Sequence, residues 1–174
     1  MGNERTVQIT SRIVTVINIL ETIACAFAAL GGLAIVTGLE EYFAKEPVNG
    51  SSDVGNVVAG VGGIFGAIIG YVLLFVGISG FIYYLIPTIK GIVTWVQTKK
   101  KLEEGPVEYF RTYKKDGITK LVFNGLPIVL STGDIISDLN HLEMEQIIVS
   151  LLFMIIPAIS VYQIIISIDG GKQE

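Results

Sequence analysis

Cysteine, histidine and charged residues are all scarce in this sequence. One of its 174 residues is cysteine, one is histidine, and 16% are charged, whereas an average soluble domain carries about 25% charged residues. The lone Cys25 excludes a disulfide within the chain. With His141 as the only histidine, zinc or haem sites of the usual ligand spacing cannot be assembled from one copy. We therefore expect no metal and no cofactor.

The common catalytic motifs are also missing. The sequence contains no nucleophile elbow, no P-loop and no zinc-protease helix motif. Its acidic pairs, Glu40 with Glu41 and Glu143 with Glu145, have no nucleophile or metal ligand close to them in the sequence, so solvated charge is the simpler explanation. These absences predict a protein that is not an enzyme.

Long apolar runs, whose one charged residue is Glu21 in the first of them, are the main feature that is present. Three runs, over residues 13–38, 57–86 and 146–168, are each long enough to cross a bilayer as a helix, because a hydrocarbon core of about 30 Å needs about 20 helical residues. With 51% hydrophobic residues overall, the chain is expected to form one membrane domain over residues 1–174, with three transmembrane helices, in the cell membrane.

The basic residues set the expected orientation of these helices. Nine of the twelve lie before residue 13 or between residues 99 and 120, whereas the first loop has only Lys45 beside several acidic residues. Basic segments stay on the cytoplasmic side, so an even number of crossings must separate the two basic segments. This favours one helix over residues 57–86 rather than two spans turning at 77–80. With three spans, the N-terminus is inside and the C-terminus outside.

A separate interfacial helix is expected over residues 88–101. Its apolar residues recur at helical spacing and its lysines fall on the other face. We interpret it as lying at the membrane surface, with Trp95 at headgroup depth and Lys99, Lys100 and Lys101 near anionic lipid. A straight continuation of the preceding span is the alternative. Beside a membrane helix, this basic cluster indicates topology and lipid rather than nucleic acid.

A small cytoplasmic β element is expected over residues 106–132. Two short runs of aromatic and β-branched residues flank Asp116 and Gly117, and Asp-Gly between such runs is a strong hairpin signal because a type I′ turn needs positive φ. A fourth span over residues 118–132 is the rival interpretation, but it is shorter than a usual span and contains charge. Residues 134–145 should then form a short amphipathic juxtamembrane helix.

Small residues form a stripe along the second run. Their positions step by three, four and seven, so a helix places them on one face: Ala59, Gly63, Gly66, Gly70, Gly77 and Gly80. Membrane helices pack closely where small side chains let their backbones approach. The stripe therefore predicts an interface, either with the first span of the same chain or with another copy or subunit. A glycine-lined pore is a weaker alternative.

Polar residues inside the predicted spans are candidate ion or proton sites. Asn18 and Glu21 share one face of the first span, and a carboxylate at membrane depth costs about 3 kcal/mol on insertion scales, so it is a functional candidate. Ser160, Gln163 and Ser167 share one side of the third span. Hydrogen bonding between helices is the alternative explanation for that polar face.

The clearest patterns are packing patterns. The leading prediction is therefore a non-enzymatic membrane protein that acts as a homo-oligomer or as an accessory subunit of a larger membrane complex. A small ion or proton channel or transport component that uses Glu21, and a sensor of anionic lipid surfaces, are the alternatives. The expected partners are the lipid bilayer and other copies of the chain or other membrane subunits, and not nucleic acid.

Overall fold

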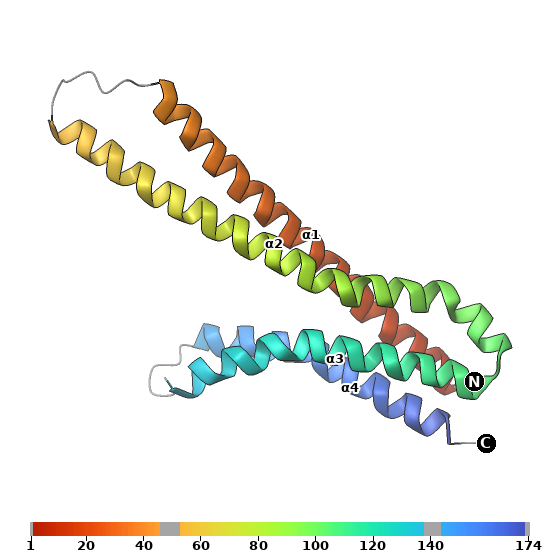
Figure 1. The fold of residues 1–174 in the computed structure, drawn as a ribbon. Coiled ribbons are helices and arrows are strands. Elements are labelled where there is room, and N and C mark those ends of the chain that lie inside the picture. Colours follow the sequence, from red (N-terminus) through yellow and green to blue (C-terminus); the bar gives the residue numbers. More distant parts are fainter. Residues whose placement is uncertain (1, 46–52, 138–143, 173–174) are drawn as a thin grey trace. The chain divides into compact units, whose positions relative to one another are not determined.

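The described residues form four α-helices (Figure 1). A computed structural model describes residues 2–45, 53–137 and 144–172, with side chains over 2–39, 61–129 and 154–172. In chain order the helices are α1 (Gly2–Lys45), α2 (Asp53–Glu103), α3 (Pro106–Ser137) and α4 (Met144–Gly170). None of the described residues forms a strand.

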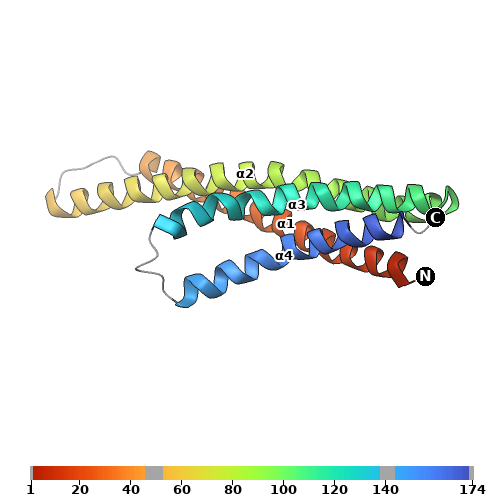
Figure 2. The ribbon, with the colours of Figure 1, turned by 90° about the horizontal axis from the view of Figure 1, so that it is seen from below.

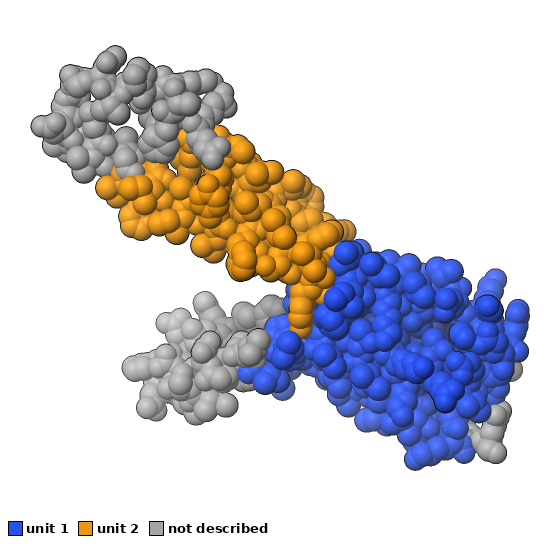
Figure 3. Space-filling model, in the orientation of Figure 1, with its two compact units in different colours: residues 1–19, 84–174 blue, residues 20–83 orange. Residues whose placement is uncertain are grey.

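The chain divides into two compact units (Figure 3). Unit 1 comprises residues 1–19 and 84–174, and unit 2 comprises residues 20–83. Unit 1 therefore holds the first part of α1, the last part of α2 and the whole of α3 and α4. Within unit 1, α3 and α4 pack side by side (Figure 1 and Figure 2).

Unit 2 is an antiparallel pair of helix segments that pack through glycine. A Cβ atom added at Gly77 would lie less than 3.0 Å from backbone atoms of Ala29, and one added at Gly32 would lie equally close to the backbone of Leu74. No side chain fits at either position, so the two backbones are in direct contact. The stripe of small residues on α2 thus faces α1 of the same chain.

Other stripe glycines also meet side chains of α1: Gly66 faces Leu39, Gly70 faces Ile35 and Val36, and Gly80 faces Cys25. Gly63 is buried. The side chain of Ala59 lies outside the described residues. The glycines in contact with α1 are therefore part of the packing within one chain.

The prediction of a β element over residues 106–132 is wrong. These residues lie in α3, and Asp116 and Gly117 occupy the middle of the helix rather than a turn. The reason is that buried side chains recur every three or four residues, at Tyr109, Tyr113, Asp116 and Lys120, so one helical face buries all of them. This long-range packing outweighs the local hairpin signal.

Gly117, which contributed to the incorrect hairpin prediction, has a packing role in α3. A Cβ atom at Gly117 would lie 2.9 Å from Cγ1 of Ile164 in α4. Its missing side chain thus allows α4 to approach α3. The turn in this region lies earlier, at Gly105, where φ is +117° and glycine avoids the strain of a left-handed conformation. Pro106 then occupies the first position of α3, where a missing N–H costs nothing.

The prediction of three spans is also wrong, so the orientation deduced from three crossings, with the N-terminus inside and the C-terminus outside, no longer follows. Of the described residues, two helical stretches, Gly2–Leu39 and Val61–Glu103, are long and apolar enough to cross a membrane. The part of α4 with described side chains, Met154–Gly170, is apolar but shorter than these two stretches. Residues near both ends of the chain contact the start of α3 within unit 1: Tyr109 donates a hydrogen bond to the Glu4 carbonyl oxygen, and Phe110 packs on Gly170.

α2 is one continuous helix of 51 residues that includes Pro87. Residues 57–86 and 88–101 are therefore parts of the same helix, and residues 77–80 do not form a turn. Residues 134–145, expected to form a separate juxtamembrane helix, cover the end of α3 and the start of α4, and 138–143 lie outside the described residues.

Candidate functional site

The described interior of unit 1 is mostly polar. Its buried polar and charged residues are Ser11, Thr15, Asn18, Thr88, Thr94, Thr98, Asp116, Lys120, Asn124, Ser160, Gln163 and Ser167. Its buried hydrophobic residues are fewer: Val7, Val14, Tyr109, Phe110 and Tyr113. Large hydrophobic side chains are instead exposed, among them Val96 at 77% and Val129 at 68%. This distribution is the reverse of that in a soluble domain, where charged residues are almost never fully buried.

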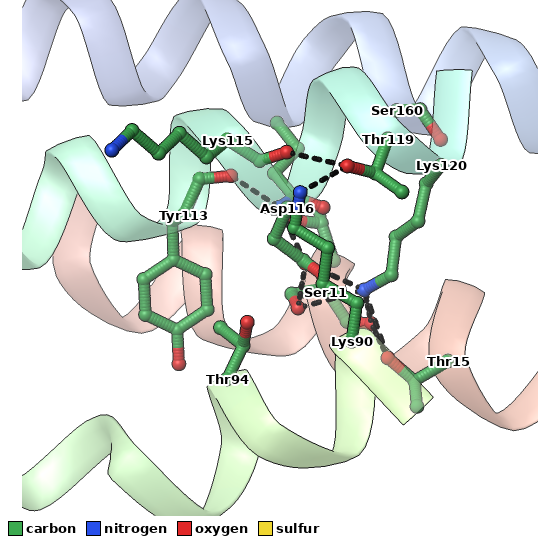
Figure 4. A network of polar contacts seen from close by, with 12 residues as sticks. Ser11, Thr15, Lys90, Thr94, Tyr113, Lys115, Asp116, Thr119, Lys120 and Ser160 are labelled. Atoms are coloured by element: carbon green, nitrogen blue, oxygen red, sulfur yellow. Dashed lines mark hydrogen bonds and ion pairs between the residues drawn. The ribbon is translucent and has the colours of Figure 1, made fainter. Parts of the chain in front are cut away.

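The ammonium group of Lys120 lies at the centre of this interior (Figure 4). It is fully buried. It donates to Oδ2 of Asp116 at 2.6 Å, to the carbonyl oxygen of Ser11 at 2.8 Å and to Oγ1 of Thr15 at 2.8 Å, and the Ser11 hydroxyl is 3.0 Å away. An ammonium group has three N–H donors, so these oxygens satisfy it completely.

Asp116 uses one of its two oxygens for all of its hydrogen bonds. Oδ2 accepts from Lys120, from the Ser11 hydroxyl at 2.7 Å and from Nε2 of Gln163 at 3.1 Å. Oδ1 is buried and has no hydrogen-bond partner among the described residues. Asp116 thus has one buried oxygen, Oδ1, that accepts no hydrogen bond and a second, Oδ2, that accepts three.

Gln163 connects α4 to this ion pair. Its Nε2 atom donates to the Tyr113 carbonyl oxygen at 2.8 Å as well as to Asp116, and its Oε1 atom is buried with no partner in the described part of the chain. Ser160 and Ser167 are also buried, but their hydroxyls donate to carbonyl oxygens of their own helix. Of this predicted polar face, Gln163 is the residue that hydrogen-bonds to the pair.

An aromatic cluster packs near the chain termini within unit 1. It consists of Val7, Tyr109, Phe110 and Tyr113, with Ile166 packed against it. The Tyr109 and Tyr113 rings have centroids 4.8 Å apart. Tyr113 also shares a hydrogen bond of 2.7 Å with the hydroxyl of Thr98, which ties α3 to α2.

Other predicted site residues lie elsewhere. Asn18 is buried in unit 1, whereas Glu21 belongs to unit 2. Trp95 is 43% exposed. The Arg12 guanidinium carbon lies 5.0 Å from the centroid of the Trp95 ring, which is a cation–π distance. Lys99 and Lys100 are exposed.

A second lysine–carboxylate pair lies on the surface at the end of α2. Lys101 donates to Glu104 at 2.6 Å. This hydrogen bond lowers the pKa of the Glu104 carboxyl below its ordinary value. The distance equals that of the buried pair, so the two pairs differ mainly in their exposure to solvent.

Sequence reasoning missed the central residues of the site. It placed Asp116 in a turn, counted Lys120 as part of a basic cytoplasmic segment, and assigned no role to Ser11 or Thr15. A signal was present, because Asp116, Lys120 and Asn124 are spaced by four residues and would share one face of a helix. Ser11 and Asp116 are 105 residues apart in the sequence, so no local pattern indicates their contact.

No group of three or more histidine, cysteine, aspartate or glutamate side chains suited to a metal ion occurs among the residues with described positions. Comparison of the chain with protein families, with curated proteins and with solved structures finds no match.

Proposed function

We propose that this chain is an integral membrane protein and that it handles a proton or a small cation at the Asp116 carboxylate. The observation that carries the proposal is the fully buried pair of Asp116 and Lys120 inside a unit with an apolar exterior. The pair takes the place of Glu21 as the centre of the predicted ion or proton site.

Exposure of the apolar helices supports placement in a membrane. In each candidate span, only 17% of the most apolar stretch is buried, whereas the core helix of a soluble protein would be mostly buried. Exposure of these apolar side chains to water is unfavourable, because burial of apolar surface contributes about 25 cal/mol per Å². Lipid accommodates an apolar exterior and a polar interior together.

A charged pair at this position favours a functional role over a purely structural one. Replacement of a buried ion pair by apolar residues of similar volume is often neutral or stabilising. Stability alone therefore gives little reason to keep Asp116 and Lys120. Ionisable residues buried at membrane depth usually mark ion pathways or proton relays, and Lys120 contacts Ser11 and Thr15 of a candidate span.

The geometry allows Asp116 to exchange one positive partner for another. Oδ1 of Asp116 and Oε1 of Gln163 are buried acceptors without donors among the described residues, so they suit a bound proton or a coordinated cation. When a proton neutralises the carboxylate, Lys120 keeps its hydrogen bonds to Ser11 and Thr15. The carboxylate can thus change its charge while the ammonium group stays solvated by oxygen.

Flux through proteoliposomes tests this proposal. Purified protein is reconstituted with a pH-sensitive dye inside the vesicles, and proton movement is followed after an imposed gradient of pH or of a monovalent cation. We expect flux in the wild type and its loss in Asp116→Asn, which preserves the shape of the side chain. Glu104→Gln, a surface change in the turn between α2 and α3, is the control and should retain flux.

Two outcomes would reject the proposal. One is a wild-type protein with no flux above empty vesicles, and the other is unchanged flux in a correctly folded Asp116→Asn variant. Glu21→Gln separates the two carboxylates: loss of flux in that variant alone would return the site to the residue that the sequence suggested.

Self-association is a second candidate function, favoured by a different surface. Gly31 and Gly38 of α1 are exposed, and a Cβ atom at either would meet nothing within 4 Å. They lie seven residues apart on one helical face, where another membrane helix could approach closely. This open face of α1 supports assembly with another copy, since the stripe glycines of α2 face α1 of the same chain.

Cysteine crosslinking in a bilayer tests the assembly role. In a Cys25→Ser background, Gly31→Cys should crosslink between copies, whereas Leu33→Cys, which is exposed on another face of α1, should not. Equal crosslinking at both positions would indicate random collision and would count against an interface at this face.

A further inference from the structure

The surface of unit 1 carries a groove between α2 and α3 that the ion pair does not use. Its volume is about 550 Å³, within the range of roughly 300–1,000 Å³ that is usual for ligand sites. One part of its wall is apolar, formed by Ile86, Ile89 and Val93 of α2. Lys90 of α2 and Lys115 of α3 also line it.

The two lysines give this groove an uncompensated positive charge. No carboxylate among the described residues lies within 4.0 Å of either ammonium group, since the ion pairs there involve other lysines and Arg111. Lys90 donates a hydrogen bond to the neutral hydroxyl of Thr119 (Figure 4). The groove therefore offers positive charge to an anion without a competing acidic side chain.

The apolar wall follows the axis of α2. Ile86, Ile89 and Val93 are spaced by three and four residues, so they lie on one helical face, and they are 49%, 52% and 44% exposed. They belong to Val61–Glu103, one of the two candidate spans. A flexible hydrocarbon chain can lie along such a face beside the charged part of the groove.

We propose that this groove binds an anionic phospholipid. Its phosphate would lie against Lys90 and Lys115, and its acyl chain along Ile86, Ile89 and Val93. Basic pockets between membrane helices are suited to anionic headgroups. A neutral lipid would leave the two positive charges without compensation, and free phosphate would leave the apolar wall in water. The inference rests on the proposed placement of unit 1 in a membrane.

Thermal unfolding of the delipidated protein in mild detergent tests this site. The midpoint is measured with added phosphatidylglycerol, with phosphatidylcholine and with inorganic phosphate alone, and binding is titrated for each. We expect phosphatidylglycerol to raise the midpoint and the other two to leave it unchanged. The double variant Lys90→Gln, Lys115→Gln should bind phosphatidylglycerol roughly tenfold or more weakly, because it removes both positive charges that line the groove.

The matched control is the double variant Arg111→Gln, Lys114→Gln. It removes the same charge from exposed positions of α3 that do not line the groove, so it should bind phosphatidylglycerol like the wild type. Each variant is compared with its own lipid-free midpoint, which separates loss of binding from loss of stability.

Three results would overturn the inference. Equal weakening in both double variants would show that general surface charge attracts the lipid. Equal binding of phosphatidylcholine would show that the lysines do not select the headgroup, and equal binding of inorganic phosphate would show that no lipid is required. Any of these results is compatible with flux that depends on Asp116, so this inference and the proposed function can fail separately.

Discussion

Units 1 and 2 pack their helices by opposite means. In unit 2, glycines bring two backbones into contact, as at Gly77 and Ala29. In unit 1, polar side chains fill the interior, and the single ammonium group of Lys120 donates to oxygens of both α1 and α3. Close apolar packing depends on shape, whereas the buried network depends on charge and on hydrogen-bond direction.

This difference determines how each unit should respond to substitution. Dispersion contacts are individually small, about 0.1–0.2 kcal/mol for each pair of atoms, so damage to unit 2 should increase with the size of the clash. A buried charge without its partner costs several kcal/mol at once. Unit 1 should therefore show large, partner-dependent effects, and unit 2 should show graded, size-dependent effects.

The largest effect is expected for Lys120→Met. This substitution removes the charge, keeps an unbranched apolar side chain and leaves Asp116 buried without its cation. We expect the free energy of unfolding in detergent to fall by about 3–5 kcal/mol, the usual cost of breaking a buried pair from one side. Chemical denaturation followed by tryptophan fluorescence provides the measurement.

The double variant Lys120→Met, Asp116→Leu is the control for that experiment. It removes both charges, so it should recover much of the lost stability, since apolar replacement of a whole buried pair is often neutral. A double variant as unstable as Lys120→Met alone would show that lost packing, rather than an unpaired carboxylate, causes the damage.

The next effect belongs to unit 2 and concerns Gly77→Ala. The new methyl group would overlap backbone atoms of Ala29, which cannot rotate away, so we expect a loss of about 1–3 kcal/mol from overpacking. Gly66→Ala should cost less, because it meets the flexible end of Leu39 at 3.1 Å. Unfolding of each variant in the same detergent gives the comparison.

Gly62→Ala is the matched control in the same helix. A Cβ atom there meets nothing within 4 Å, and alanine favours a helix over glycine by about 1 kcal/mol, so stability should stay unchanged or rise. A loss at Gly62 as large as that at Gly77 would show that helix contact does not set the order of the series.

The sequence could predict the features of the fold that depend on one segment alone. Residues 13–38 and 57–86 lie in helices as expected, because the length of an uncharged run and the spacing of its apolar residues are local properties. The β prediction failed at Asp116 and Gly117, where local turn preference competed with burial against distant helices. Tertiary contacts decide whether such a segment forms a hairpin or a helix.

The candidate site could not be predicted for the same reason. Ser11 and Lys120 are 109 residues apart in the sequence, and neither is unusual in its own surroundings. The sequence did single out Gln163, but it could not identify the Asp116 carboxylate as its partner. The predicted position of the C-terminus depended on a count of three crossings, and the structure supports two candidate spans among the described residues.

A smaller effect is expected for the neutral hydrogen bond between Tyr113 and Thr98 in unit 1. Tyr113→Phe removes the hydroxyl but keeps the ring, and should cost about 1 kcal/mol, the usual contribution of a buried hydrogen bond. A double-mutant cycle with Thr98→Val should give a coupling of about 0.5–1.5 kcal/mol. Additive losses would show that the two hydroxyls do not stabilise each other.

The smallest effect should come from the surface pair that matches the buried one in distance. Lys101 lies 2.6 Å from Glu104, and Lys120 lies 2.6 Å from Asp116, yet the side chains of the second pair are fully buried and those of the first are 22% and 37% exposed. Water and salt screen the exposed pair. Glu104→Gln should therefore leave the unfolding midpoint unchanged within error at pH 7.

The pH dependence of that variant sharpens the comparison. Because the hydrogen bond from Lys101 lowers the pKa of Glu104, any stability that it contributes is present above the ordinary value of 4.5 and is lost as the pH falls through the lowered pKa. Any difference between wild type and Glu104→Gln should thus shrink below pH 4.5. If Glu104→Gln destabilised the protein at pH 7 as much as Lys120→Met does, burial could not be what separates the two pairs, since their distances are equal.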